Sequence, residues 1–481
     1  MSELQKTSRA VVWSFAQGWS GQLIGLAVFV VLAWHLSAEA FGLVAMAMVF
    51  IAFTQLFVEQ GLSSAIIQHP DPTKEHLSTA FWTNFLAGTT LTIFAYLFSG
   101  VIAELFKQPN LEEVVKWLSL ALFLNSLVSV QVAIFKKAMN FKSIAMTSII
   151  SSILSGLIGV VLAINGFGVW SLVGQQLSKG VFRIVLLWAQ SDWRPMFFWS
   201  YTQFRELFSY SVNVIGINLF EFSNRYADNL LIGLYLGPTA LGYYALAYKF
   251  YRTLLKLVGG LANQVAFSSF SISQKDILKV RNSFYTSTQT MAFIAFPIFM
   301  VIGVLAPEFF TLLLGEKWEN SVLIFQILIV VALIECVLFF NGSLMMALGK
   351  PNWRLRLNML NAAVNIIGFY IVVRWGIEFV ALAYVVRTYL LCPIALHCVK
   401  LLVDIKYSEY VKGLLGPFLC AASVSIVAVL IQFVLGNRIP ELFTILITAS
   451  LCMALYLLFS YLFMKKHLDL LWSSAIAVVA R

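Results

Sequence analysis

Three charged side chains lie close together within one long apolar segment of this sequence. Glu221, Arg225 and Asp228 are spaced so that all three fall on one face of a helix. Inside a membrane each charge would cost roughly 2.5–3.5 kcal/mol on insertion scales, so the group needs a purpose. Two interpretations stay open. The three residues could neutralise one another against a neighbouring helix, or they could line a water-filled cavity where Arg225 binds an anion and an acid titrates.

Other apolar segments also carry charges without a local partner. Lys179 and Arg183 share a helix face that has no nearby acid, so each needs a carboxylate or a phosphate. A structural ion pair with the segment that holds Arg225 is the alternative. The candidate bases are Lys179, Arg183, Arg225, Lys249 and Arg387, and the candidate ion-coupling acids are Glu221, Asp228 and Glu335. The bases outnumber the acids, which favours an anionic ligand.

The composition places these charges in a membrane protein. Of the 481 residues, 60% are hydrophobic and only 11% are charged, with a mean hydropathy of +0.87. Soluble chains are about 25% charged. The same figures exclude a disordered chain, a collagen and a disulfide scaffold. The net charge is +10, but the sequence contains no run of five basic residues. The basic residues therefore indicate cytoplasmic loops of a membrane protein, and we expect no nucleic-acid partner.

We predict an all-α integral membrane protein, because about fourteen apolar segments are long enough to span a bilayer. With the N-terminus in the cytoplasm, 22 of the 32 Lys and Arg residues fall in cytoplasmic loops. The even number of spans then puts both termini on that side. The first span lacks a signal-peptidase site, so we expect it to be retained. The predicted spans are 10–34, 41–65, 78–103, 114–135, 143–165, 168–189, 207–235, 239–262, 283–306, 320–346, 354–374, 378–400, 410–434 and 441–464.

The sequence contains no motif that indicates an enzyme or a motor. GxxxxGK[ST], HExxH and GxSxG are absent, the five histidines are scattered, and no loop is long enough to fold as a domain. The five cysteines lie in apolar stretches without CxxC spacing, so we expect free buried thiols. We therefore expect no enzyme, no catalytic residue, no metal and no cofactor, apart from a coupling proton or sodium ion.

An internal repeat is shifted by 200 residues. Residues 36–50 and 236–250 are identical at six of fifteen positions without a gap, among them Gly42 and Gly242. The shift spans six predicted helices, so both copies have one orientation, and we predict two six-helix lobes related by an axis along the membrane normal. The expected parts are an N-terminal lobe 1–189, a cytoplasmic inter-lobe linker 190–206, a C-terminal lobe 207–400, two further helices in 401–464 and a cytoplasmic tail 465–481.

Three stretches of the sequence resemble a known family. They are AEAFGLVAMAMVFIAFTQLFVEQGLSSAIIQ (38–68), GFGVWSLVGQQL (166–177) and DNLLIGLYLGPTALGYYALAYKF (228–250). They are similar to the bacterial polysaccharide transporters, the Wzx-type lipid-linked oligosaccharide flippases, and especially to colanic-acid and teichuronic-acid exporters. The resemblance covers most of residues 10–400. It implies the two-lobe, fourteen-helix fold of the multidrug/oligosaccharidyl-lipid/polysaccharide exporter superfamily.

The resemblance also implies a function. The protein would move an undecaprenyl-diphosphate-linked repeat unit from the cytoplasmic to the periplasmic leaflet for exopolysaccharide, capsule or O-antigen synthesis, by ion-coupled alternating access. The candidate bases would hold the diphosphate in a cavity between the lobes, and Tyr244, Tyr248 and Asn218 would contact sugar. Plain helix packing is the alternative for the tyrosines. We expect a monomer in the bacterial inner membrane, with a polysaccharide polymerase and chain-length or export machinery as partners.

Two other functions stay open. A cation-coupled multidrug or small-molecule antiporter of the same fold would favour acids over bases in its cavity. A polysaccharide polymerase or ligase is expected to carry a large outside loop with acceptor-binding residues, and no such loop is present in this sequence.

Reporter fusions test the predicted orientation. A fusion after Arg205 and a second fusion at the C-terminus should both report cytoplasm, because the basic loops face that side. A periplasmic signal at either position would exclude this topology.

Overall fold

The computed structural model describes residues 19, 21–59, 61–435 and 439–464. All the regular structure in these residues is helical. In hydrocarbon each peptide N–H and C=O must find a partner within its own segment, which helices achieve. Within the described residues, ten helices are long and apolar enough to span a membrane, or eleven if the bent pair α4 and α5 counts as one span. The prediction of an all-α membrane protein is confirmed. The predicted tail 465–481 lies outside the described residues.

The chain divides into two compact units. The first unit comprises the described part of 1–245 together with 369–377, and the second comprises 246–368 with the described part of 378–481. The division falls inside helix α10 and not in the linker 190–206, where it was expected. The two predicted lobes stay a prediction.

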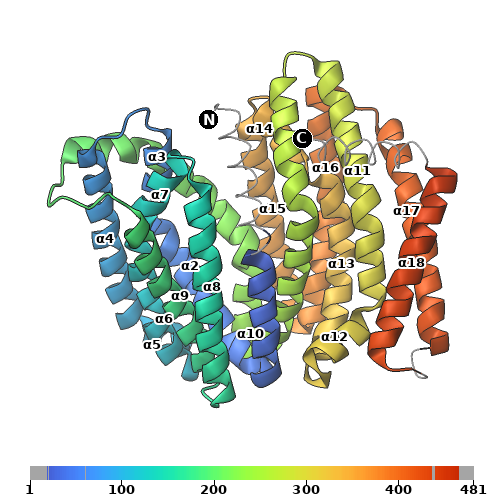
Figure 1. Ribbon diagram of the computed structural model, residues 1–481, viewed down its shortest axis with the longest axis horizontal. Helices are drawn as coiled ribbons and strands as arrows, with labels where there is room; N and C mark the ends of the chain where they lie inside the picture. The colour runs from blue at the N-terminus through green and yellow to red at the C-terminus, as the bar shows by residue number, and fades with distance from the viewer. Residues whose placement is uncertain (1–18, 20, 60, 436–438, 465–481) are drawn as a thin grey trace. The chain divides into compact units, whose positions relative to one another are not determined.

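The first unit contains the N-terminal helices (Figure 1). They are Gly21–His35, α2 (Ala38–Glu59), α3 (Leu62–Gln68), α4 (Lys74–Leu97), α5 (Ser99–Leu105), α6 (Asn110–Ser126), α7 (Ser129–Lys137), α8 (Phe141–Ile164), α9 (Val169–Gln190) and the first part of α10 (Tyr201–Ile272). Helix α8 packs along α9, and α6 packs against α2, α4 and α9. Small residues on α8 let this helix approach the helix Gly21–His35 closely. A Cβ at Gly156 would lie 2.5 Å from Val28 Cγ2.

The second unit contains the rest of α10 and most of the C-terminal helices. They are α11 (Ile277–Val304), α12 (Ala306–Leu314), the short η1 (Glu316–Trp318), α13 (Asn320–Leu338), α14 (Asn341–Ala347), α15 (Pro351–Val372), α16 (Ile377–Val403), α17 (Tyr407–Leu435) and α18 (Glu441–Phe463). The short η2 (Val373–Trp375) follows α15 and belongs to the first unit. Helix α11 packs on α13 and α17, and α17 runs beside α18 (Figure 1). The five cysteines are free as expected. Cys336, Cys420 and Cys452 are buried, while the other two are half-buried.

A sharp break divides α10 where the sequence predicts a turn. Gly237 has a φ of +83°, a left-handed conformation that favours glycine, and Pro238 follows it. Proline has no N–H to continue the preceding helix, so a new helix begins there. The two predicted spans 207–235 and 239–262 are therefore separate helices on either side of this break.

The two copies of the repeat meet in a reciprocal backbone contact within the first unit. A Cβ at Gly42 would overlap the carbonyl group of Pro238, and a Cβ at Gly242 would overlap the carbonyl group of Ala38. The 200-residue shift relates Ala38 to Pro238 and Gly42 to Gly242. A two-fold axis imposes this kind of reciprocity: if a residue of one copy contacts a second residue of the other copy, the same two contacts occur with the copies exchanged. The contact therefore supports the parallel repeat.

Substitution of either glycine should loosen this contact. Gly42→Ala and Gly242→Ala should each destabilise the protein by about 1–3 kcal/mol, since backbone atoms must move apart. Thermal unfolding of the purified protein measures the effect. Gly25→Ala is the matched control, because a Cβ at Gly25 would have no neighbour within 4 Å and alanine favours a helix. Equal melting temperatures for all three variants would refute the close approach.

Candidate functional site

A carboxylate on α13 is the centre of a polar cluster inside the second unit. Tyr251 Oη donates a hydrogen bond of 2.5 Å to Glu335 Oε2, and Tyr384 Oη donates one of 2.9 Å to Oε1. Tyr251 is fully buried and Tyr384 is 7% exposed. The carboxylate thus joins α10, α13 and α16 through one hydroxyl per oxygen. Such bonds to an ionised acceptor are stronger than neutral ones.

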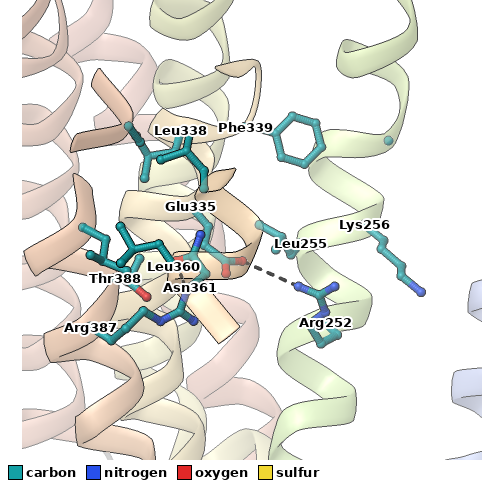
Figure 2. A pocket seen from close by; sticks show the side chains of 14 residues that line it. Arg252, Leu255, Lys256, Glu335, Leu338, Phe339, Leu360, Asn361, Arg387 and Thr388 are labelled. Atoms are coloured by element: carbon teal, nitrogen blue, oxygen red, sulfur yellow. Dashed lines mark hydrogen bonds and ion pairs between the residues drawn. The ribbon is translucent and has the colours of Figure 1, made fainter. Parts of the chain in front are cut away.

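Two guanidinium groups from different helices border this cluster (Figure 2). Arg252 Nη1 on α10 lies 3.7 Å from Glu335 Oε2, an ion pair without a close hydrogen bond. Arg387 on α16 stacks its guanidinium 4.4 Å from the centroid of the Tyr384 ring and donates from Nη1 to Asn361 Oδ1 at 3.0 Å. Arg387 Nε is buried and has no acceptor among the described residues. Both guanidiniums therefore keep donor capacity that a ligand could use.

These side chains line a cavity of about 400 Å³. Its polar lining consists of Arg252, Lys256, Glu335, Asn361, Arg387 and Thr388. Leucines and Phe339 complete the wall, and Lys256 directs its amine away from Glu335 (Figure 2). Three bases and one acid give the lining an excess of positive charge. A pocket of this size with few polar groups on an apolar wall is typical of a binding site, here for an anion.

Helical periodicity aims these residues at one point. Tyr248, Arg252 and Lys256 follow at intervals of one turn on α10. On α16 the same spacing aligns Tyr384 with Thr388, and Arg387 lies beside them. The ring of Tyr248 lies 6.0 Å from the Arg252 guanidinium, so it borders the site.

The structure brings together only some of the predicted site residues. Glu335 and Arg387 line the cavity, and Tyr248 lies beside it. Lys249 belongs to the same unit but is exposed and is not among the lining residues. Lys179, Arg183 and Asn218 belong to the first unit, so their predicted contact with substrate stays a prediction.

The predicted charged stripe on α10 splits into a buried and an exposed part. Asp228 is 4% exposed and accepts hydrogen bonds from Tyr244 Oη at 2.8 Å and from the Asn229 amide at 2.7 Å. Glu221 and Arg225 are exposed, and neither forms an ion pair with any residue that the structure describes. The expected pairing of Asp228 with Arg225 is therefore absent from this structure.

The role expected of Tyr244 needs a correction. Its side chain is fully buried, so the ring has no free face on which a sugar could stack. Its hydroxyl stabilises the Asp228 carboxylate instead. Helical spacing placed Tyr244 on a face with Tyr248 but did not show which element covers that face.

Sequence reasoning noted Tyr251 only as a neighbour of Tyr244 and Tyr248, and it assigned no site role to three members of the cluster. They are Arg252, Asn361 and Tyr384. Arg252 and Lys256 were counted among the 22 basic residues on the cytoplasmic side, although both lie within the predicted span 239–262. Their spacing of one helical turn from Tyr248 was the available signal.

The apolar helices and the charged cavity inside one unit are those of a multi-pass membrane protein with an internal polar site. The family described as "Polysaccharide biosynthesis protein" matches residues 31–323, and the chain belongs to this family. It is 26% identical over 384 residues to the teichuronic acid biosynthesis protein TuaB of Bacillus subtilis (strain 168), a match that covers 78% of each chain. It is 24% identical over 448 residues to the lipopolysaccharide biosynthesis protein WzxC of Escherichia coli (strain K12), covering 91% of this chain and 90% of that protein.

A solved structure shares the whole fold. The lipid II flippase MurJ, in an inward closed conformation, superposes with a TM-score of 0.80 at 18% identity, covering 95% of this chain and 99% of MurJ. An inward-facing multidrug transporter of the MATE family gives a TM-score of 0.64 at 14% identity, and the match covers 80% of this chain and 96% of the transporter. The predicted family and its transporter fold are confirmed.

The two tyrosines should stabilise the second unit through Glu335. Tyr384→Phe and Tyr251→Phe each remove a hydrogen bond from a buried hydroxyl to a half-buried carboxylate, so each should cost about 1.5–3 kcal/mol. Tyr389→Phe on the same α16 is the control, because its exposed hydroxyl makes only a 3.3 Å bond to the Val330 carbonyl. Thermal unfolding compares the three variants. A cost no larger than that of the control would contradict the cluster geometry.

Proposed function

We propose that this protein is a flippase for an undecaprenyl-diphosphate-linked oligosaccharide. It moves the repeat unit from the cytoplasmic to the periplasmic leaflet of the bacterial inner membrane, with both termini in the cytoplasm, and supplies surface polysaccharide synthesis. Family membership and the similarity to proteins named for teichuronic acid and lipopolysaccharide biosynthesis support the proposal. The fold of a lipid II flippase agrees with it.

The basic cavity in the second unit is the observation that carries this proposal. A diphosphate cannot enter hydrocarbon without compensation of its charge. Arg252 and Arg387 offer guanidinium donors on a wall that is otherwise largely apolar. Guanidinium groups bind phosphate oxygens in bidentate geometry, which makes arginine suited to this group. The cavity of about 400 Å³ accommodates a charged group of diphosphate size. The sugars and the prenyl chain lie beyond it.

Glu335 gives the site a means of coupling to an ion. At 3.7 Å its contact with Arg252 is loose, so the same guanidinium can turn between the carboxylate and a phosphate. Protonation of Glu335, or a sodium ion bound to it, would release Arg252 to the substrate. A ligand shifts a conformational equilibrium only through its differential affinity for the two states, and this competition provides such a difference. Ion-coupled alternating access follows from it.

A multidrug antiporter is the second candidate, because the MATE fold matches this chain as well. Cationic drugs need acidic partners in the binding cavity. The lining contains three bases against one acid, which favours an anionic substrate. The charge of the cavity therefore separates the two functions.

Deletion of the gene followed by rescue tests the flippase function. The deletion strain should lose surface polysaccharide and accumulate the undecaprenyl-diphosphate-linked repeat unit, without a change in drug susceptibility. Arg387→Ala should restore at least about tenfold less polysaccharide than the wild-type gene, because a charge-assisted contact is worth about 1.5–3 kcal/mol. Arg387→Lys should restore part of the activity, since lysine keeps the charge but not the bidentate geometry.

Arg356→Ala is the matched control, because Arg356 lies on α15, is exposed and does not line the cavity. Immunoblots of membranes must show equal amounts of all variants. Arg225→Ala in the same assay tests the predicted role of the exposed α10 arginine. Normal export by Arg387→Ala would refute the cavity assignment, and drug sensitivity with normal polysaccharide would favour the antiporter. A strain that lacks the polymerase or the chain-length machinery would test in the same assay whether export depends on these partners.

A further inference from the structure

Two histidines and a glutamate converge in the first unit. His69 directly follows α3, His76 lies in the first turn of α4, and Glu206 lies near the start of α10. His69 Nε2 lies 2.9 Å from Glu206 Oε1, and His76 Nε2 lies 3.2 Å from Oε2. The expectation that the histidines lie scattered is wrong for this pair. The chain turns back between α3 and α4, and α10 supplies the acid from 130 residues further on.

The geometry points to a binding site for a divalent transition metal, which we propose is Zn²⁺, at His69, His76 and Glu206. The three donor atoms lie within 4.8 Å of one another. Ligands of a tetrahedral zinc lie about 2.0–2.2 Å from the ion, which separates them by about 3.4 Å. The donor atoms therefore need only small movements to surround an ion. Imidazole nitrogens select zinc over calcium and magnesium, which prefer oxygen ligands.

The surroundings of the donors hold them in place. Thr73 caps α4, and its hydroxyl lies 2.8 Å from His76 Nδ1. In this structure His76 Nδ1 accepts from the Thr73 amide at 3.3 Å. An imidazole that binds a metal through Nε2 would carry a proton on Nδ1, and the Thr73 hydroxyl could then accept it in place of the amide contact, as the second shell of zinc sites commonly does. The amine of Lys137 on α7 donates to the carbonyls of His69 and Pro70 and so fixes the loop before α4. His69 Nδ1 accepts from the Asp71 amide at 3.2 Å, a contact that metal binding would exchange.

Charge and exposure suit an open zinc site. Glu206 places one carboxylate oxygen against each imidazole ring. The His76 side chain is 11% exposed, that of His69 19% and that of Glu206 54%. The exposed side leaves room for water as a fourth ligand, as in sites with three protein ligands. A bound ion would fasten the α3–α4 loop to the start of α10 and so act as a structural staple.

Zinc titration of the purified full-length protein, after chelator treatment, tests the proposal. Wild-type protein should bind one equivalent of Zn²⁺. Glu206→Gln and His76→Ala should lower the affinity for Zn²⁺ by more than about 100-fold, because the loss of a second-shell partner alone lowers metal affinity by about 10–100-fold. Thr73→Val should weaken binding by about tenfold for that reason. Co²⁺ in place of Zn²⁺ should give the visible absorption of a tetrahedral site in wild-type protein and not in Glu206→Gln.

Two controls remove a donor outside the cluster. His397→Ala removes a ring that contacts Tyr407, and Glu75→Gln removes a carboxylate that accepts from Gln203 beside the cluster. Both should bind Zn²⁺ like wild-type protein, and Zn²⁺ should raise their melting temperature but not that of Glu206→Gln. Glu206→Gln keeps the shape of the side chain, so its unfolding curve without metal shows that the variant is folded. Absent binding, or equal binding by wild-type protein and Glu206→Gln, would overturn the metal site and leave a hydrogen-bonded contact.

Discussion

The need of every backbone amide for a hydrogen-bond partner in hydrocarbon governs this structure. Only helices meet this need within one segment, so the apolar chain forms helix after helix. Where the helices break, glycine and proline supply the required backbone. Gly237 adopts a positive φ, and Pro238 begins the next helix without an unsatisfied N–H. The repeat also depends on glycine, because the absence of a side chain at Gly42 and Gly242 lets two backbone segments come into direct contact.

Polar side chains follow the same rule inside the second unit. Glu335 places an ionisable group among apolar helices, and hydroxyls from two other helices satisfy one oxygen each. A half-buried charge of this kind is stabilised by hydrogen bonds and by an opposite charge. Arg252 supplies that charge, but from 3.7 Å. The carboxylate is thus fixed in position by neutral groups, while its charge partner keeps freedom to move.

Hydropathy predicted where helices would form but not where they would break. The span predicted at 41–65 consists of α2 and α3, and that at 78–103 consists of α4 and α5, bent by 52°. Apolar length says nothing about backbone continuity within a span. Periodicity likewise showed that Asp228 shares a face with Arg225, yet Tyr244 is its partner. Contacts between distant segments, such as that of His76 with Glu206, leave no local pattern to find.

The basic cavity shows that a basic residue of an apolar segment can either orient the protein in the membrane or line a binding site. Lys and Arg near helix ends orient a membrane protein, and Arg252 was counted for that purpose. The same guanidinium lies one helical turn from Tyr248 and lines a cavity with Arg387. Arg387 Nε has no acceptor among the described residues, and Arg252 makes only a long contact. A partly satisfied buried network costs stability, and such violations of local rules are expected at functional sites. A bound anion would supply the missing hydrogen-bond acceptors. The unsatisfied donors of the free protein would therefore favour binding of the ligand.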